Sequence, residues 1–338
     1  MRTADSGALG LILLMTLAMS SEAVDIRWEA ARVSKAWVTA LAESSQPQRV
    51  PAPTNRIVVR RGREVVTVYE AKTTDFALGE PSVSRDGSRV AFLKAERSGG
   101  RDLQYLYVMN IDGTDLRQLL EWERPGNYFK GAYLGGAVVA WAHDNRTLVA
   151  EGYIQHPEAK ALRALVHVDL HSGRVSQLAE LPTRGPASHQ AAITSQAWAP
   201  DNRRIVYMDD QFHTIVLDTA SRARVDLGPG RKPTWAPDGR FIAVQELPAP
   251  GSTRPGDYVR ITPEPPHERI RVLSNAPRWF SFSRLGYYGP ALWMPDSRFV
   301  IVFDHVMEDR VPHVLDTDTG DIGKLPKGFG GESWGGKP

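Results

Sequence analysis

The feature that most constrains the fold of this chain is a short phrase that recurs five times. Each copy has an apolar stretch, two connecting residues, an Asp and then Gly, Asn or Ser, and four copies carry a Trp three residues before the Asp. The five aspartates are Asp86, Asp144, Asp201, Asp238 and Asp296. A repeated unit of this size does not bury its apolar face alone and stacks on its neighbours. The sequence therefore predicts a repeat architecture.

Each phrase predicts two strands joined by a tight turn. Asp accepts hydrogen bonds inside its own turn, and Gly or Asn tolerates a positive φ angle. The apolar runs after the turns, such as 204–207 and 299–303, are rich in the β-branched and aromatic residues that strands prefer. Most copies continue into a second hairpin, with its turn at Asp112-Gly113, Ser172-Gly173 or Thr319-Gly320. Each unit is thus expected to hold four antiparallel strands, as a β-propeller blade does.

The spacing of the repeats predicts six blades, with five or seven as alternatives. The turn aspartates are 58, 57, 37 and 58 residues apart, and a four-stranded blade takes about 40–50 residues. The longer steps therefore include inserted loops. We expect the sixth blade to combine a hairpin at 56–69, an outer strand at 75–78 and an innermost strand from the C-terminal tail, 328–335. Such a closed ring removes exposed sheet edges, and the propeller would occupy residues 55–338.

The phrase resembles the repeats of the TolB-type propeller family, the WD40-like Pro-Asp repeats. The segment from Trp235 to Arg240 is most similar to that family's Trp-Ser-Pro-Asp-Gly signature, and Leu106 to Thr114 resembles its outer hairpin. The resemblance covers residues 55–325 and implies the fold, with no activity attached to it. The family's sizeable N-terminal domain has no counterpart of that size here, so its envelope role is not carried over. Departures from the signature fall at Val83, Arg85 and His143.

The N-terminal residues predict export. Residues 1–23 have a basic start, a short apolar core and a small-residue cleavage site, as a secretory signal peptide does. An uncleaved anchor is the alternative. We expect a periplasmic or secreted protein with no transmembrane segment after cleavage. The chain has no Cys, which excludes disulfides and thiolate metal sites.

Residues 24–54 are expected to form an amphipathic helix followed by a Pro-rich linker. Five apolar residues fall at helical spacing, at Ile26, Ala30, Val33, Trp37 and Leu41. This helix is expected to pack on the propeller, and the alternative is that it docks on a partner or a membrane surface. The prolines of residues 46–53 indicate a stiff connection to the first strand.

The charge pattern argues against a nucleic-acid partner. The chain has 41 Lys and Arg against 39 Asp and Glu, and the two signs are interspersed. No long basic run with interleaved aromatic residues is present, so the sequence lacks the electrostatic footprint of a nucleic-acid-binding protein.

No catalytic residue is predicted. Residues 331–335 read Gly-Glu-Ser-Trp-Gly and fit the Gly-x-Ser-x-Gly phrase of serine hydrolases. That phrase needs a strand-turn-helix context with an acid and a His that follow in the chain, and neither follows here. Ser333 is therefore expected to lie in a loop or a closing strand. The four turn tryptophans are expected to pack between blades, with an aromatic binding ring as the alternative.

The candidate binding residues lie near the end of the second strand of each unit, about eight residues after the turn Asp. Equivalent positions in all blades face the same end of a propeller, so polar side chains there can converge in a funnel. The candidates are Asp209, Asp210, His213, Glu246, Asp304 and His305. They are read in three ways, as solvated loop residues, as a polar ligand funnel, or as a site for a divalent metal such as Mn²⁺. No cofactor is predicted, although a divalent metal fits these ligands.

Two functions from different classes follow from the sequence. The first is a non-enzymatic scaffold in the cell envelope that binds a protein or a glycan. The second is a metal-dependent carbohydrate lyase or hydrolase that uses the funnel, with a carboxylate on the metal and a His moving a proton. Fold alone does not decide between them.

Overall fold

A computed structural model describes residues 38–43, 56–61, 64–71, 76–79, 81–124, 138–156, 159–181, 191–247, 258–271, 291–306, 309–324 and 333–335. The predicted signal peptide and Pro-rich linker lie outside the described residues. Over these ranges, no helix has the length and apolar character needed to cross a bilayer.

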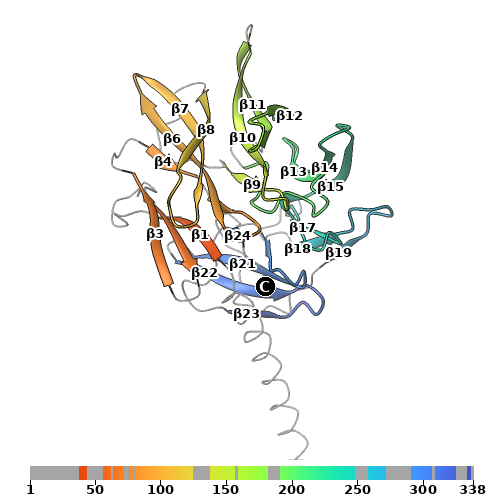
Figure 1. Cartoon of the computed structure of the whole chain (residues 1–338). Helices are drawn as coiled ribbons and strands as arrows, with labels where there is room; N and C mark the ends of the chain where they lie inside the picture. Colours follow the sequence, from red (N-terminus) through yellow and green to blue (C-terminus); the bar gives the residue numbers. More distant parts are fainter. Residues whose placement is uncertain are drawn as a thin grey trace, which may run out of the picture.

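The described residues form antiparallel sheets that follow one another around a common centre in chain order (Figure 1). The first sheet contains β24 (Ser333–Gly335), β1 (Val38–Glu43), β2 (Arg56–Arg61) and β3 (Glu64–Glu70), in that order. The second contains β4 (Phe76–Leu78), β5 (Ser82–Val83), β6 (Arg89–Ser98), β7 (Arg101–Asn110) and β8 (Arg117–Arg124). The third contains β9 (Val139–Trp141), β10 (Thr147–His156), β11 (Ala159–Asp169) and β12 (Val175–Leu181).

Three further sheets continue the series. The fourth contains β13 (Arg204–Met208), β14 (His213–Asp218) and β15 (Arg224–Pro229), and an isolated bridge from Trp198 to Ile205 marks its innermost position. The fifth contains β16 (Arg231–Trp235), β17 (Ile242–Gln245), β18 (Tyr258–Ile261) and β19 (Arg269–Arg271). The sixth contains β20 (Leu292–Trp293), β21 (Phe299–Val306), β22 (Asp309–Asp316) and β23 (Ile322–Lys324). The predicted all-β class, with several four-stranded antiparallel sheets arranged as propeller blades, is confirmed.

The first sheet joins the two ends of the chain. β24 pairs with β1, with Ala40 opposite Ser333, and β1 pairs in turn with β2. The C-terminal tail therefore supplies the innermost strand of this sheet. This pairing satisfies the backbone groups of a strand that would otherwise be left with an open edge.

Two details of the predicted closure are wrong. Val38–Glu43, whose first residues belong to the predicted helix, form strand β1. The helical spacing of their apolar residues is overridden because β1 pairs on both sides, with β2 and with β24. The predicted outer strand at 75–78 is also misplaced. It is β4, and it pairs with β6 of the second sheet, with Leu78 opposite Lys94.

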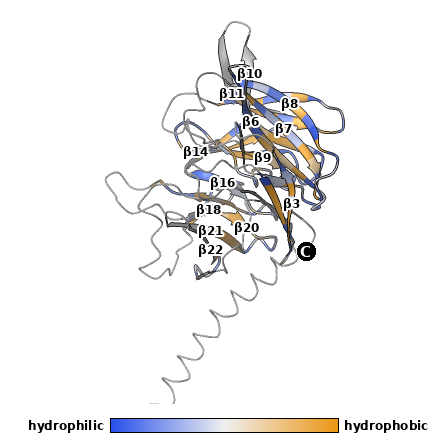
Figure 2. Ribbon diagram, turned by 90° about the vertical axis from the view of Figure 1, so that its left-hand side faces the viewer, coloured by the Kyte–Doolittle hydropathy of each residue, from blue (hydrophilic) through white to orange (hydrophobic). Residues whose placement is uncertain are grey.

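The core lies between the sheets, where large apolar residues of neighbouring sheets interlock. Trp141 packs with Ala91 and Leu106 of the preceding sheet, and Trp235 packs with Val206 and Val216. The apolar strands of the sheets appear in Figure 2 as orange ribbon. Trp198, Trp235 and Trp293 are among the largest fully buried side chains, and the predicted packing role of the tryptophans is confirmed.

The repeated turns have the geometry that their residues predict. The carboxylate of each turn Asp accepts a backbone N–H two residues later, at 2.8 Å from Arg203 to Asp201 and 3.0 Å from Arg298 to Asp296. The residue after the Asp has a positive φ in every copy, at Gly87, Asn145, Asn202, Gly239 and Ser297. This left-handed conformation costs little for Gly and Asn, which explains the residue types of the repeat.

The turns are also joined to one another. In three of the five copies, the side chain that follows the turn Asp accepts a hydrogen bond from the backbone N–H of the turn Asp in the preceding sheet. Asn145 accepts from Asp86 at 2.9 Å, Asn202 from Asp144 at 2.9 Å, and Ser297 from Asp238 at 3.0 Å. Between the fourth and fifth sheets the position is Gly239, where an added Cβ would come within 2.9 Å of Cγ of Pro200. Contact with Pro200 thus replaces the hydrogen bond at that step.

Asn202→Ala should destabilise the protein by about 1–2 kcal/mol, because it removes the acceptor for Asp144 and places Ala at a positive φ. Asn202→Gly keeps the backbone conformation and should cost about half as much. Urea unfolding of both variants measures the difference, with the exposed strand variant Glu180→Ala as the control. Equal stability of the Ala variant and the unmodified protein would contradict a stabilising role for these hydrogen bonds between turns.

Candidate functional site

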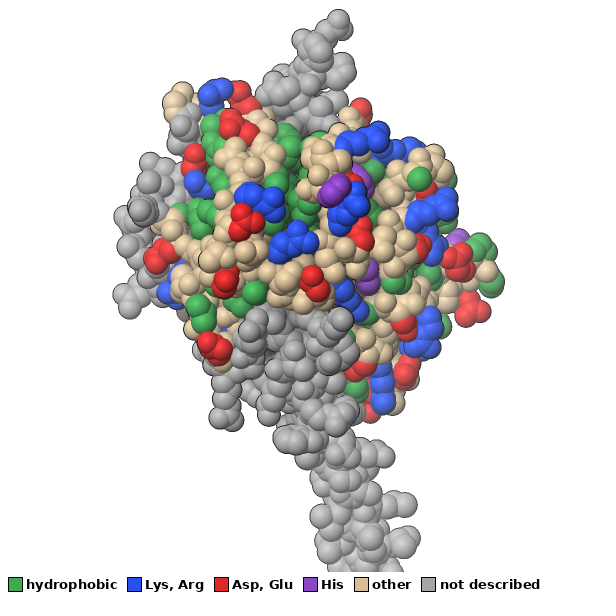
Figure 3. All heavy atoms as spheres, viewed as in Figure 1, with side chains coloured by type: hydrophobic (Ala, Val, Ile, Leu, Met, Phe, Trp, Pro, Cys, Tyr) green, Lys and Arg blue, Asp and Glu red, His purple; other side chains and the backbone are tan. Residues whose placement is uncertain are grey.

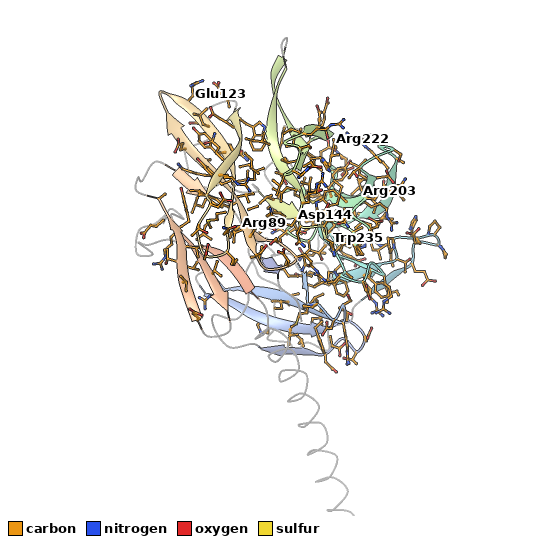
Figure 4. The ribbon with its side chains drawn as sticks, in the orientation of Figure 1. Arg89, Glu123, Asp144, Arg203, Arg222 and Trp235 are labelled. Carbon is orange, nitrogen blue, oxygen red and sulfur yellow. The ribbon has the colours of Figure 1, made fainter. Side chains whose placement is uncertain are left out.

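The ring has two different ends. The turn face carries the repeated Asp turns, and the funnel face carries the ends of the second strands and the hairpins that follow them. Figure 4 shows Asp144 and Trp235 near the middle of the ring and Glu123 at its rim. The predicted binding residues belong to the funnel face, so their contacts decide what this face can do.

The described funnel candidates make local contacts within their own sheets. The Asp209 carboxylate accepts the backbone N–H groups of Gln211 at 2.9 Å and His213 at 2.8 Å, and so closes the β13–β14 hairpin. Asp210 accepts from the side chain of Gln211 at 3.2 Å. The remaining described candidate, Glu246, lies 3.9 Å from the guanidinium of Arg269.

His213 points to the outer strand of its own sheet. Its Nδ1 lies 2.7 Å from a carboxylate oxygen of Asp226 on β15. The hydrogen bond to Asp226 raises the pKa of His213 above the usual value, since the neighbouring carboxylate stabilises the charged imidazolium. This pair is solvent-accessible and lies toward the outside of the fourth sheet.

The metal-site prediction remains a prediction. The backbone of Asp304 and His305 lies in β21, opposite Val311 and Arg310, and their side chains lie outside the described set. Within the part of the chain that the structure describes, no three His, Asp or Glu side chains come together as metal ligands would.

Other positions at the funnel end serve packing. Gly152 lies directly beneath the ring of Trp122, and an added Cβ would come within 2.7 Å of that ring. Gly152 is therefore required for the contact between the second and third sheets. Lys94 also lies at this end of the ring, where it forms a 2.5 Å ion pair with Glu96 on the same strand.

A buried carboxylate that the sequence prediction did not select joins the third and fourth sheets. Glu151 accepts the backbone N–H groups of Ala192 at 2.5 Å and Ile193 at 3.1 Å, and it pairs with Arg163 at 2.5 Å. Burial raises the pKa of Glu151, against the opposing effect of Arg163 and the two amides. The signal in the sequence is a lone charge within the apolar run 148–152.

Glu151→Gln should destabilise the protein by about 3 kcal/mol, because it leaves the Arg163 guanidinium buried without its charged partner. Adding Arg163→Met removes that buried charge and should recover part of the loss. Denaturant unfolding of the two single variants and the double variant gives the coupling energy. Strictly additive effects would contradict the pairing.

The middle of the ring is crossed by Gln196. Its side-chain amide donates to the backbone O of Trp293 at 2.8 Å and accepts from the backbone N of Trp293 at 2.7 Å. The backbone O of Gln196 also accepts from Trp235 at 2.8 Å. Gln196 thus joins the fourth, fifth and sixth sheets. Its side-chain amide pairs with the backbone N–H and C=O of Trp293 as a neighbouring strand would. Beside it, a cavity of about 40 Å³ opens toward the turn face.

Threonine and tryptophan side chains tie the remaining innermost segments together. Thr194 donates to the carbonyl of Pro233 at 2.9 Å, and Thr234 donates to that of Ala291 at 2.7 Å. The indole N–H of Trp293 donates back to the carbonyl of Thr234 at 3.1 Å. These contacts fix the spacing between the fourth, fifth and sixth sheets.

Solved structures with the same arrangement of sheets are available for comparison. TolB from Acinetobacter baumannii superposes with a TM-score of 0.59 and 14% identity, over 89% of this chain and 67% of that one. The fold is a β-propeller. An oligogalacturonate lyase in complex with manganese has a TM-score of 0.52 and 11% identity, over 86% of this chain and 78% of its own. A chain of a nidogen–laminin complex also has a TM-score of 0.52, at 9% identity and over 86% and 92%.

These similarities define the fold of the propeller and leave its function open. No protein-family model matches the chain, and no curated protein sequence matches it. At identities of 9–14%, the structural neighbours share the architecture with this chain, and they are proteins of different kinds. Ser333–Gly335, the last three residues of the Gly-x-Ser-x-Gly phrase, form strand β24. The serine of this phrase therefore lies in a strand that pairs with β1.

Proposed function

We propose that this propeller is an exported, six-bladed binding scaffold of the cell envelope, periplasmic or secreted, which offers its funnel face to a protein or a glycan. The observation that carries the proposal is the β10–β11 hairpin. β9 pairs with β10 only from Leu148 to Ala150, and β12 pairs with β11 only as far as Arg163. The hairpin continues to the pair His156–Ala159, so its tip projects beyond both neighbours (Figure 1).

A projecting hairpin suits recognition for a physical reason. The backbone N–H and C=O groups on its outer edges are not used by another strand of the described chain, and such edges accept an added strand or an extended chain. A rigid ring fixes the hairpin at its base, which limits the entropy lost on binding.

The surface charge supports a protein or glycan partner. Basic and acidic side chains are interspersed over the face seen in Figure 3, with no single-sign field. A polyanion such as nucleic acid is bound by a concentrated basic surface. Among the structural neighbours, one belongs to a nidogen–laminin complex, which makes a scaffold role consistent with the architecture.

The scaffold proposal is tested by shortening the hairpin. Because Ile154 and Leu162 are opposite each other, residues 155–161 can be replaced by Asn-Gly, which forms a two-residue hairpin turn. Photo-crosslinking in envelope extract should capture one specific partner with the unmodified protein. Capture should fall at least about tenfold with the shortened variant, and the unfolding midpoint should not change. Arg222→Ser, in an exposed turn of the other face, is the matched control and should capture normally.

Equal capture by the shortened variant would contradict the scaffold proposal. A metal-dependent carbohydrate lyase or hydrolase is the second candidate, and the fold similarity to the manganese-bound oligogalacturonate lyase favours it. Titration of the full chain with Mn²⁺ separates the two functions. Stoichiometric binding that is lost in His305→Ala would favour the enzyme, and no binding would favour the scaffold.

A further inference from the structure

The cavity on the turn face lies at the two units that depart from the repeat signature. Arg85 and His143 occupy the position before the turn Asp that is Pro200, Pro237 and Pro295 in the other copies. Both side chains line the cavity, together with Ser195, Gln196 and Trp198. Loss of two prolines thus places a guanidinium and an imidazole where the other units have an apolar ring.

The chemistry of the cavity favours a negatively charged ligand. The Arg85 guanidinium can only donate hydrogen bonds, and no Asp or Glu is among the lining residues. The nearest carboxylates that act on His143, those of Asp144 and Asp201, already accept backbone N–H groups within their own turns. A guanidinium with neighbouring N–H donors binds a carboxylate in a planar, two-pronged manner.

We propose that this cavity binds a small oxyanion of the carboxylate class, held by Arg85 and His143. The volume of about 40 Å³ accommodates a single carboxylate group. Gln196 provides a rigid wall, because both ends of its amide are bound to Trp293. The site goes beyond the proposed scaffold function and lies at the opposite end of the ring from the funnel face.

The binding should be linked to protonation of His143. Burial, and then the charge of Arg85, lower the pKa of His143 to about 4, while the backbone of Trp198 and the carboxylates of Asp201 and Asp144 oppose that shift. An anion between Arg85 and His143 stabilises the imidazolium, so it raises the pKa of His143. The affinity for the ionised carboxylate should therefore increase as the pH falls below the pKa of His143 in the complex.

The test uses the full-length protein and acetate as the probe. Acetate should shift the NMR resonances of the His143 ring and raise its pKa. Calorimetry at two pH values above about 5, where acetate stays ionised, should show tighter binding at the lower pH. Phosphate and chloride are the comparison ions. Weaker binding of both is expected, because phosphate is bulkier and chloride offers no pair of oxygens.

One variant and one control complete the test. Arg85→Gln should weaken acetate binding by about tenfold, while the exposed turn variant Arg240→Gln should bind normally. Unchanged unfolding midpoints separate loss of the site from loss of the fold. The proposal is overturned if acetate leaves His143 unshifted, if Arg85→Gln binds as tightly as the unmodified protein, or if phosphate binds more tightly than acetate.

Discussion

The architecture depends on hydrogen bonds that cross from one turn to the next. A side chain at a residue with positive φ receives the backbone N–H of the preceding turn, as in Asn145 with Asp86 and Asn202 with Asp144. Each of these bonds joins two sheets that share no strand. Because the same residue also sets the geometry of its own turn, local conformation and contact between sheets are specified together.

In the core beneath the turns, the tryptophans and Gln196 also form hydrogen bonds between neighbouring sheets. The indole of Trp293 fills the space between the fifth and sixth sheets and donates to the backbone of Thr234. Gln196 reaches Trp293 from the fourth sheet. Cooperative contacts of this kind over-determine the spacing of the sheets, so the hairpins and loops above them can vary without loss of the ring.

The parts of the fold that were predictable from the sequence are those encoded by neighbouring residues. The Asp turns and the buried tryptophans each have a local signal, such as the Asp201-Asn202 pair. Strand β1 has a misleading one, since Val38–Leu41 continue a helical spacing and become a strand only by pairing with β2 and β24. The Glu151 contacts and the bridge made by Gln196 join residues 41 and 97 positions apart, and no local pattern specifies them. The candidate funnel was predicted by equivalent positions alone, which could not show that Asp209 and His213 bond within their own sheet.

The central claim is that the chain closes its ring by pairing β24 with β1, and the absence of native Cys gives a direct measurement. Ala40→Cys with Ser333→Cys places two thiols at residues that face each other across the pair. The account predicts that mild oxidation forms this disulfide within the folded protein and raises its unfolding midpoint, because the bond closes a long loop. If both thiols stay reduced and react freely with an alkylating reagent under folding conditions, the two ends of the chain are not paired and the account fails.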